Sequence, residues 1–176
     1  MHRRHLNELL RRYAQRFPHE RPLVARFEAF VAAHDDCLQR SCEPGHVTAS
    51  AWILSPTGEA VLLTHHKKLA RWLQLGGHVD GEAAIERACL REAREESGMV
   101  EFTFVPWAEG ELVPLDLDVH TIPAHGREPQ HLHWDVRFLL RAGPGQALQV
   151  SSESNRLAWV PVGRLREFTA EESVLR

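Results

Sequence analysis

The sequence predicts an α/β protein in which a helical extension precedes one main domain. Apolar residues recur at helical spacing as far as Val31, whereas strand-like segments and one helix alternate from about His46 onward. The chain has 176 residues, 43% of them hydrophobic, which is enough to bury a sizeable core. We therefore expect an extension at residues 1–45 and a main domain at residues 46–176.

Two helices are expected in the extension. Each has an apolar stripe, and Pro22 suits the first turn of the second helix. Short helices gain most of their stability from packing, so these two should dock on the main domain or form a homodimer contact. The stripes consist of Leu6, Leu9, Leu10 and Tyr13, and of Leu23, Val24, Phe27, Phe30 and Val31.

The main domain should open with a β-hairpin. Residues 47–54 and 60–64 have strand composition, and the turn residues 55–58 separate them. Residues 83–97 are helical by composition and stop at Gly98, a residue that suits the end of a helix. Further strands are expected at 101–105, 111–119, 131–140 and 158–160, with a loop at 123–129 and a short polar helix at 164–168.

Composition and charge exclude several classes of protein. The net charge of −3 lacks the basic excess of a general nucleic-acid binder. No apolar run approaches the length of a membrane span, and an amphipathic segment follows the basic N-terminus where a signal peptide would be apolar. The three cysteines form no CxxC pair, which favours free thiols in a reducing compartment. We expect a cytoplasmic protein whose partners include neither a membrane nor nucleic acid.

The helix expected at residues 83–97 has carboxylates in an unusual position. On a helical wheel Ile85, Cys89, Glu92 and Glu96 share one stripe, which is apolar at its start and acidic at its end. Burying unpaired carboxylates is costly, and the helix dipole disfavours negative charge at a C-terminus. A hard cation with oxygen ligands, Mg2+ or Mn2+, would offset both effects. Because Mg2+ often completes its coordination with phosphate oxygens, the stripe predicts phosphate chemistry.

A longer pattern surrounds this stripe. From Gly77 the chain follows G-x5-E-x7-R-E-U-x-E-E-x-G-U, where U is a bulky apolar residue. Ala83 stands in place of the first glutamate, and Ala93 is smaller than the usual U. Through this long, discontinuous match the chain resembles the Nudix hydrolases. The residues in register are Gly77, Arg91, Glu92, Glu95, Glu96, Gly98 and Met99.

The resemblance implies a fold and a reaction. The fold would be an α/β/α sandwich with a mixed β-sheet, over about residues 46 to 165. The reaction would be Mg2+-dependent hydrolysis of a diphosphate linkage in a nucleoside diphosphate-linked or related small molecule, by attack of a metal-activated water on phosphorus. The family's first glutamate helps to fold the loop onto the helix, so Ala83 concerns loop geometry more than metal binding. The metal ligands would be Glu92, Glu95, Glu96 and the Gly77 carbonyl, with Arg91 orienting the glutamates.

Other residues are candidates for the proton acceptor and for substrate contacts. Glu92 or Glu153 would take the proton of the attacking water. A basic and aromatic segment lies just before the glycine-rich loop, where it could meet phosphates and a stacking base. A strand farther along places His131, His133 and Asp135 on one face. The substrate-binding candidates are Lys67, Lys68, Trp72, Gln74, His131 and His133.

Two alternative functions are consistent with other features of the sequence. A Nudix-like module could sense a nucleotide without cleaving it, although the intact glutamates disfavour this. Alternate histidines on a strand are also a recurrent zinc-ligand arrangement. A zinc-binding protein would then use His120, His125, His131 and His133.

Overall fold

Two helices that lie side by side begin the chain in this computed structural model, which describes residues 3–107, 110–124, 126 and 128–175. They are α1 (Arg4–Arg16) and α2 (Arg21–Ala33), joined by the short 3-10 helix η1 (Pro18–Glu20). Proline occupies the first turn of α2, where its missing N–H costs nothing. Both predicted helices of the extension are confirmed.

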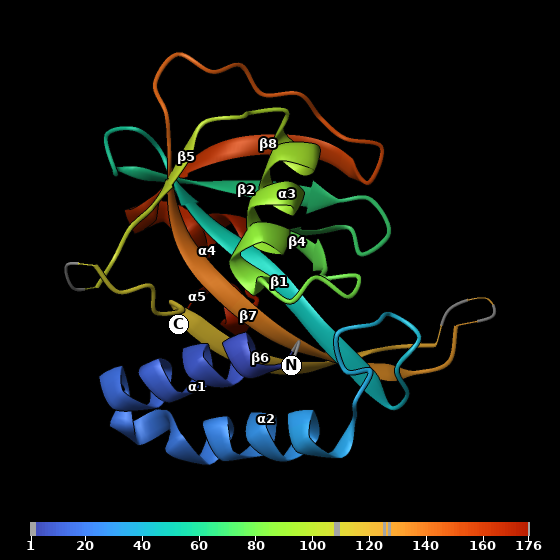
Figure 1. Cartoon of the computed structure of the whole chain (residues 1–176). Helices are drawn as coiled ribbons and strands as arrows, with labels where there is room; N and C mark the ends of the chain where they lie inside the picture. Colours follow the sequence, from blue (N-terminus) through green and yellow to red (C-terminus); the bar gives the residue numbers. More distant parts are fainter. Residues whose placement is uncertain (1–2, 108–109, 125, 127, 176) are drawn as a thin grey trace.

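The main domain is built on one mixed sheet, with two parallel strands, β1 and β7, at its centre (Figure 1). They pair from Gly45 opposite Leu132 to Leu54 opposite Arg141. The other strand pairs of the described residues are antiparallel. The strands are β1 (Gly45–Leu54), β2 (Ala60–His66), β3 (Arg71–Leu73), β4 (Leu75–His78), β5 (Phe102–Phe104), β6 (Asp116–Ile122), β7 (His131–Ala142) and β8 (Ser154–Pro161).

Helices cover the two faces of this sheet. Helix α3 (Ile85–Ser97) crosses in front of it in Figure 1, and α1 and α2 lie below α3. Behind the sheet, the short 3-10 helix η2 (Val162–Arg164) leads to α4 (Leu165–Phe168), which is followed by α5 (Glu172–Leu175). Val174 of α5 packs with Leu63 and Val160 in a second, smaller core. The predicted α/β class with a mixed sheet is confirmed.

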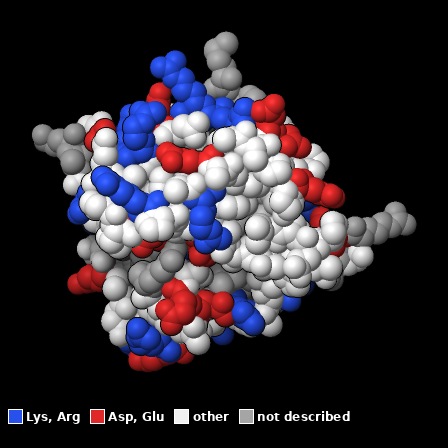
Figure 2. Space-filling model, turned by 90° about the horizontal axis from the view of Figure 1, so that it is seen from below, with Lys and Arg blue, Asp and Glu red and all other residues white. Residues whose placement is uncertain are grey.

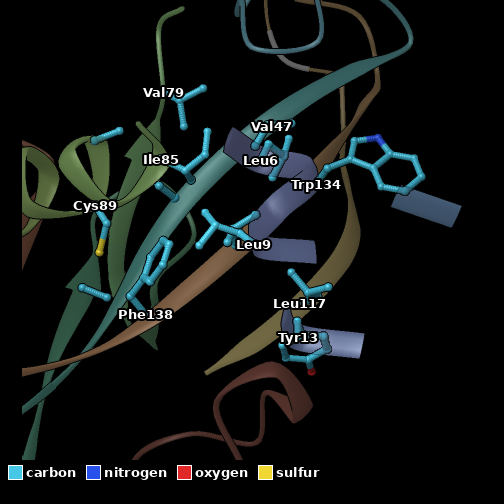
Figure 3. Close-up of a cluster of buried hydrophobic side chains, with 14 of the residues drawn as sticks. Leu6, Leu9, Tyr13, Val47, Val79, Ile85, Cys89, Leu117, Trp134 and Phe138 are labelled. Atoms are coloured by element: carbon cyan, nitrogen blue, oxygen red, sulfur yellow. The ribbon is translucent and has the colours of Figure 1, made fainter. Parts of the chain in front are cut away.

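A single hydrophobic core joins the extension to the main domain (Figure 3). In β1 and β7 alternate residues point to the same face, so every second side chain of each strand enters this core. Leu6 and Leu9 of α1 meet Val47 and Phe138 of the sheet, and Cys89 of α3 belongs to the same cluster. The extension is therefore packed as deeply as the elements of the main domain.

Some boundaries differ from the sequence prediction. Strands β3 and β4 were not predicted, because each is very short and β4 contains two adjacent glycines. The strand expected at 111–119 starts only at Asp116. The polar tail ends in α5, whose Val174 is buried by a contact that no local pattern indicates.

The surface of the molecule carries charges of both signs. In the view from below, basic and acidic side chains are interspersed over the visible face (Figure 2). No helix among the described residues is both long and apolar enough to cross a membrane.

Candidate active site

Helix α3 places the signature glutamates beside strand β4. The helix packs its apolar side against β1 and β4, with Ile85, Ala88, Cys89 and Ala93 buried. It ends at Gly98, whose φ of 72° is a left-handed conformation that favours glycine. The acidic end of the helix is thereby fixed next to the glycine backbone of β4.

Glu96 is the most buried of these glutamates. Its side chain accepts the N–H of Gly76 at 2.7 Å, and only 7% of the residue is exposed. Burial raises the pKa of Glu96 to about 8; the Gly76 hydrogen bond opposes this rise, and the negative charges of Glu92, Glu153 and Glu95 add to it. A carboxylate in such surroundings favours a proton or a cation.

Arg91 connects two of the other glutamates to the loop. Its guanidinium donates to Glu92 and to the carbonyl of His78, the latter at 2.7 Å, and lies 3.5 Å from Glu95. Burial raises the pKa of Glu92, while the charge and hydrogen bond of Arg91 lower it. Arg91 therefore positions the carboxylate of Glu92 against β4.

The residues at this edge fit a divalent cation bound through oxygen. A Cβ on Gly77 would lie 2.5 Å from Glu92 Oε2, so only glycine leaves room for the carboxylate against the backbone. Carboxylate and carbonyl oxygens are the ligands that Mg2+ prefers. In the described structure the carboxylate oxygens of Glu92, Glu95 and Glu96 do not all lie within 4.8 Å of one another. Arg91 binds Glu92 and Glu95, whereas the Gly76 N–H binds Glu96. Binding would require side-chain rotation at Arg91 or Glu95.

Glu153 lies on the same side of the molecule although it is distant in sequence. Its backbone carbonyl accepts the N–H of Lys67 at 2.8 Å, which ties the turn after β2 to the turn before β8. Its charge is among those that raise the pKa of Glu96. The fold thus brings Glu153, Lys67 and the glutamates of α3 into one region.

The remaining substrate candidates have different surroundings. Lys68 is exposed in the same turn as Lys67. The ring of Trp72 packs edge-on against His65 and Phe168, with centroid distances of 5.2 and 5.7 Å. Oε1 of Gln74 is buried and has no hydrogen-bond partner among the described residues, so it could accept a donor from a ligand.

The sheet surface turned away from α3 is polar along β1 and β7. We call it the polar face. At its centre Asp135 accepts hydrogen bonds from Thr48 at 2.9 Å and from Ser50 at 2.5 Å. Arg137 donates to Ser50 at 3.3 Å and to Asp116 at 3.1 Å. The polar face is formed by His46, Thr48, Ser50, His78, Asp116, Asp118, His120, His131, His133, Asp135 and Arg137.

Several histidines meet at one end of the polar face. His131 and His133 lie on one strand face, as the alternation predicted, and His120 lies opposite His133 on β6. His125 falls outside the described residues. Two members, His46 on β1 and His78 on β4, were not predicted from the sequence, because only strand register brings them there. The position of His46 at the start of the first strand gave no indication of this.

The glycine-rich loop before α3 rests on the extension. Gly81 donates its N–H to the carbonyl of Leu38 at 2.8 Å, and a Cβ on Gly81 would lie 2.3 Å from the side-chain amide of Gln39. Ala83, where the signature has glutamate, is half-buried in this loop. Contacts from residues 38 and 39 therefore support a loop that lacks the usual glutamate.

Comparison with known proteins agrees with this geometry. The family model described as the NUDIX domain matches residues 44–175. No curated protein matches the chain. A solved structure of a NUDIX-family hydrolase from Clostridium perfringens is 27% identical, with a TM-score of 0.57, over 74% of this chain and 91% of that chain.

Two further solved structures share the fold at lower identity. An Ap4A hydrolase from C. elegans is 17% identical, with a TM-score of 0.55, over 72% of this chain and 88% of that one. The dihydroneopterin triphosphate pyrophosphohydrolase of E. coli is 18% identical, with a TM-score of 0.54, over 72% of this chain and 88% of its own. Since the family match spans most of the chain and falls on the glutamates of α3 and the glycines of β4, this protein belongs to the Nudix hydrolase family.

Proposed function

We propose that this protein hydrolyses a phosphoanhydride linkage of a nucleoside diphosphate-linked or related small molecule, with Mg2+ or Mn2+ as cofactor. One observation carries the proposal: Glu96 is buried against the Gly76 backbone with Glu92, Glu95 and Glu153 raising its pKa. Such a cluster of negative charge needs a cation, and oxygen ligands select a hard one.

The residues proposed to hold the metal are Glu92, Glu95, Glu96 and the carbonyl of Gly77. A bound divalent ion supplies charge neutralisation of the diphosphate and lowers the pKa of water. Arg91 holds Glu92 in place and, through the His78 carbonyl, fixes the glycine backbone beside it. The chain would thus position the substrate phosphates at this edge of the sheet.

The proton of the attacking water needs an acceptor on the protein. As the water oxygen bonds to phosphorus and the bridging P–O bond breaks, that proton would pass to a carboxylate oxygen of Glu92 or Glu153. Lys67 and Lys68 lie on an exposed turn tied to Glu153, where they can pair with phosphate oxygens. Trp72, Gln74, His131 and His133 are proposed to meet the rest of the substrate.

A substrate screen tests the proposal. Nucleoside triphosphates, nucleotide sugars, dinucleotides and coenzymes should be incubated with the protein and Mg2+ or Mn2+, and phosphate or nucleotide release should be measured. We expect turnover of at least one class that chelator abolishes. The two related structures are named for different substrates, Ap4A and dihydroneopterin triphosphate, so the shared fold does not indicate which substrate class to expect. Absence of metal-dependent turnover across all classes would contradict the proposal.

A further inference from the structure

Five histidines gather at one end of the polar face. The ring centroid of His46 lies 4.9 Å from that of His133, 5.1 Å from that of His131 and 5.0 Å from that of His78. The ring of His120 lies 5.5 Å from His133. These imidazoles come from four strands of the sheet: β1, β4, β6 and β7.

Strand register accounts for the cluster. His46 lies opposite His133 in the parallel β1–β7 pair, and His133 lies opposite His120 in the antiparallel β6–β7 pair. His131 is two residues from His133 and therefore shares its face. All five histidines are therefore on strands of the sheet and not on loops.

We propose that His46, His131 and His133 bind a transition-metal ion of the zinc class, at a site separate from the carboxylates of α3. One ligand atom from each of the three side chains lies within 4.8 Å of the others. A tetrahedral ion with Zn–N bonds of about 2.0–2.1 Å needs nitrogens about 3.3 Å apart. Ring rotation would have to bring the three nitrogens to this spacing.

Unsatisfied ring nitrogens provide independent support for a ligand at this place. His46 is only 2% exposed, and neither of its nitrogens has a hydrogen-bond partner among the described residues. Nε2 of His133 is also buried and lacks a partner in that same set. A buried polar atom left unpaired costs about 1–3 kcal/mol. A metal bound to one nitrogen of each ring would offset part of this cost.

The third ring is already oriented for coordination. Nδ1 of His131 lies 2.9 Å from the carbonyl oxygen of Pro129. A carbonyl can only accept, so Nδ1 carries a proton, and in the neutral ring the lone pair is then on Nε2. Metal-binding histidines commonly donate their other N–H to a carbonyl in this way, which fixes the tautomer.

The chemistry of the ligand atoms favours an ion of the zinc class over Mg2+ here. Neutral imidazole suits zinc and related ions but is a poor ligand for Mg2+. Three protein ligands leave one position for water or a ligand oxygen.

Zinc titration of the full-length, untagged protein tests this inference. Metal is first removed with chelator, and Zn2+ is then titrated by calorimetry in excess Mg2+, which competes for the carboxylates. We expect one zinc ion per chain. His131→Gln and His133→Gln should each weaken binding by at least about 10-fold. His120→Gln is the matched control within the cluster, because that ring is hydrogen-bonded to Asp118 and forms no group of three close ligand atoms with other residues that the structure describes.

A second control separates this site from the proposed catalytic metal. Glu96→Gln should leave zinc binding intact, whereas zinc binding lost in Glu96→Gln but kept in both histidine variants would overturn the inference. Circular dichroism of each metal-free variant checks folding. If a histidine variant fails to fold, X-ray absorption of zinc-loaded wild type decides: imidazole ligands are expected, and coordination by oxygen alone would overturn the site. His131 and His133 are also proposed substrate contacts, but zinc binding is measured without turnover, so failure of this inference and failure of the proposed hydrolysis are distinguishable.

Discussion

Glu96 combines burial with proximity to other negative charges, which is unfavourable unless a cation or a proton is bound. We predict that Glu96→Gln lowers kcat by about 100-fold or more, because lost charge stabilisation of several kcal/mol has this effect. The fold should persist, since glutamine can still accept the Gly76 N–H. Mg2+-dependent turnover of the best substrate is the measurement.

The matched control for this change is Glu28→Gln, at an exposed position of α2. It removes one negative charge without touching the candidate site, so its kcat should match that of wild type. A Glu96→Gln enzyme within a few fold of wild type would show that Glu96 is not a metal ligand.

The raised pKa of Glu96 also predicts how stability depends on pH. Below its ordinary value of 4.5, folded and unfolded states both hold the proton and Glu96 makes no difference. As pH rises from 4.5 to about 8, the unfolded state releases this proton while the folded state retains it, so folding is increasingly penalised. In chelator, the Tm of wild type should therefore fall relative to that of Glu96→Gln across this range.

Thermal melts of both proteins at several pH values measure this difference. Comparing the two proteins cancels contributions from other groups, including the buried histidines. A Tm difference that stays constant from pH 4.5 to 8 would mean that the Glu96 carboxyl is ionised in the folded state as readily as in the unfolded chain.

At the scale of elements, the loop before α3 depends on residues of the extension. We predict that Gly81→Ala lowers kcat/KM several-fold, because its φ of +81° strains alanine and its Cβ would contact Gln39. Gly145→Ala is a matched control, since its φ of +73° imposes similar strain in open space. Both should lose about 1 kcal/mol of stability. Equal kcat/KM in the two variants would contradict a role for the 38–39 contacts in positioning the loop.

Helix α3 begins without a capping side chain. Ala84 occupies the N-cap position. Its methyl side chain cannot accept a hydrogen bond from the free N–H groups of the first turn. Ala84→Ser should therefore raise the free energy of unfolding by about 1 kcal/mol. Denaturant unfolding measures this, with Ala29→Ser at an exposed position of α2 as a control that should be slightly destabilising. A destabilised Ala84→Ser would show that the loop geometry excludes a cap.

The sequence predicted elements whose determinants are local. Three local features predicted helix positions correctly, because each acts within one or two turns. They are the apolar stripe from Leu6 to Tyr13, the proline at the start of α2 and the glycine after α3. The acidic stripe of α3 likewise indicated that Glu92 and Glu96 are close enough for their charges to interact. Strand β4 escaped prediction because its two glycines have no strand preference, and pairing with β1 holds it in place.

Residues brought together by register could not be predicted. His46 and His133 are neighbours only because β1 pairs in parallel with a strand far along the chain. The support of Gly81 by Leu38 depends on how the extension docks, which no motif encodes. The effect of the Glu153 charge on the pKa of Glu96 also could not be predicted, because it depends on a distance that only the fold sets.

At the scale of the whole molecule, the extension and the main domain share one core. Leu9 of α1 is fully buried in it, so Leu9→Ala should cost about 2–5 kcal/mol of stability. Leu23→Ala, at a partly buried position of α2, should cost less. Calorimetric melting should show one transition in both variants. A separate low-temperature transition in Leu9→Ala would mean that the extension unfolds independently of the main domain.

The parallel pairing of β1 and β7 has a consequence for synthesis on the ribosome. The chain is made from its N-terminus, so β1 and the glutamates of α3 emerge well before β7, whose residues 131–142 supply the central partner strand. Until then β1 lacks its neighbour on that side, and the buried helices α1 and α2 lack much of the surface on which they pack. Closing contacts this distant in sequence is slow. The nascent chain should therefore expose apolar surface until β7 has emerged and form its candidate active site only after that.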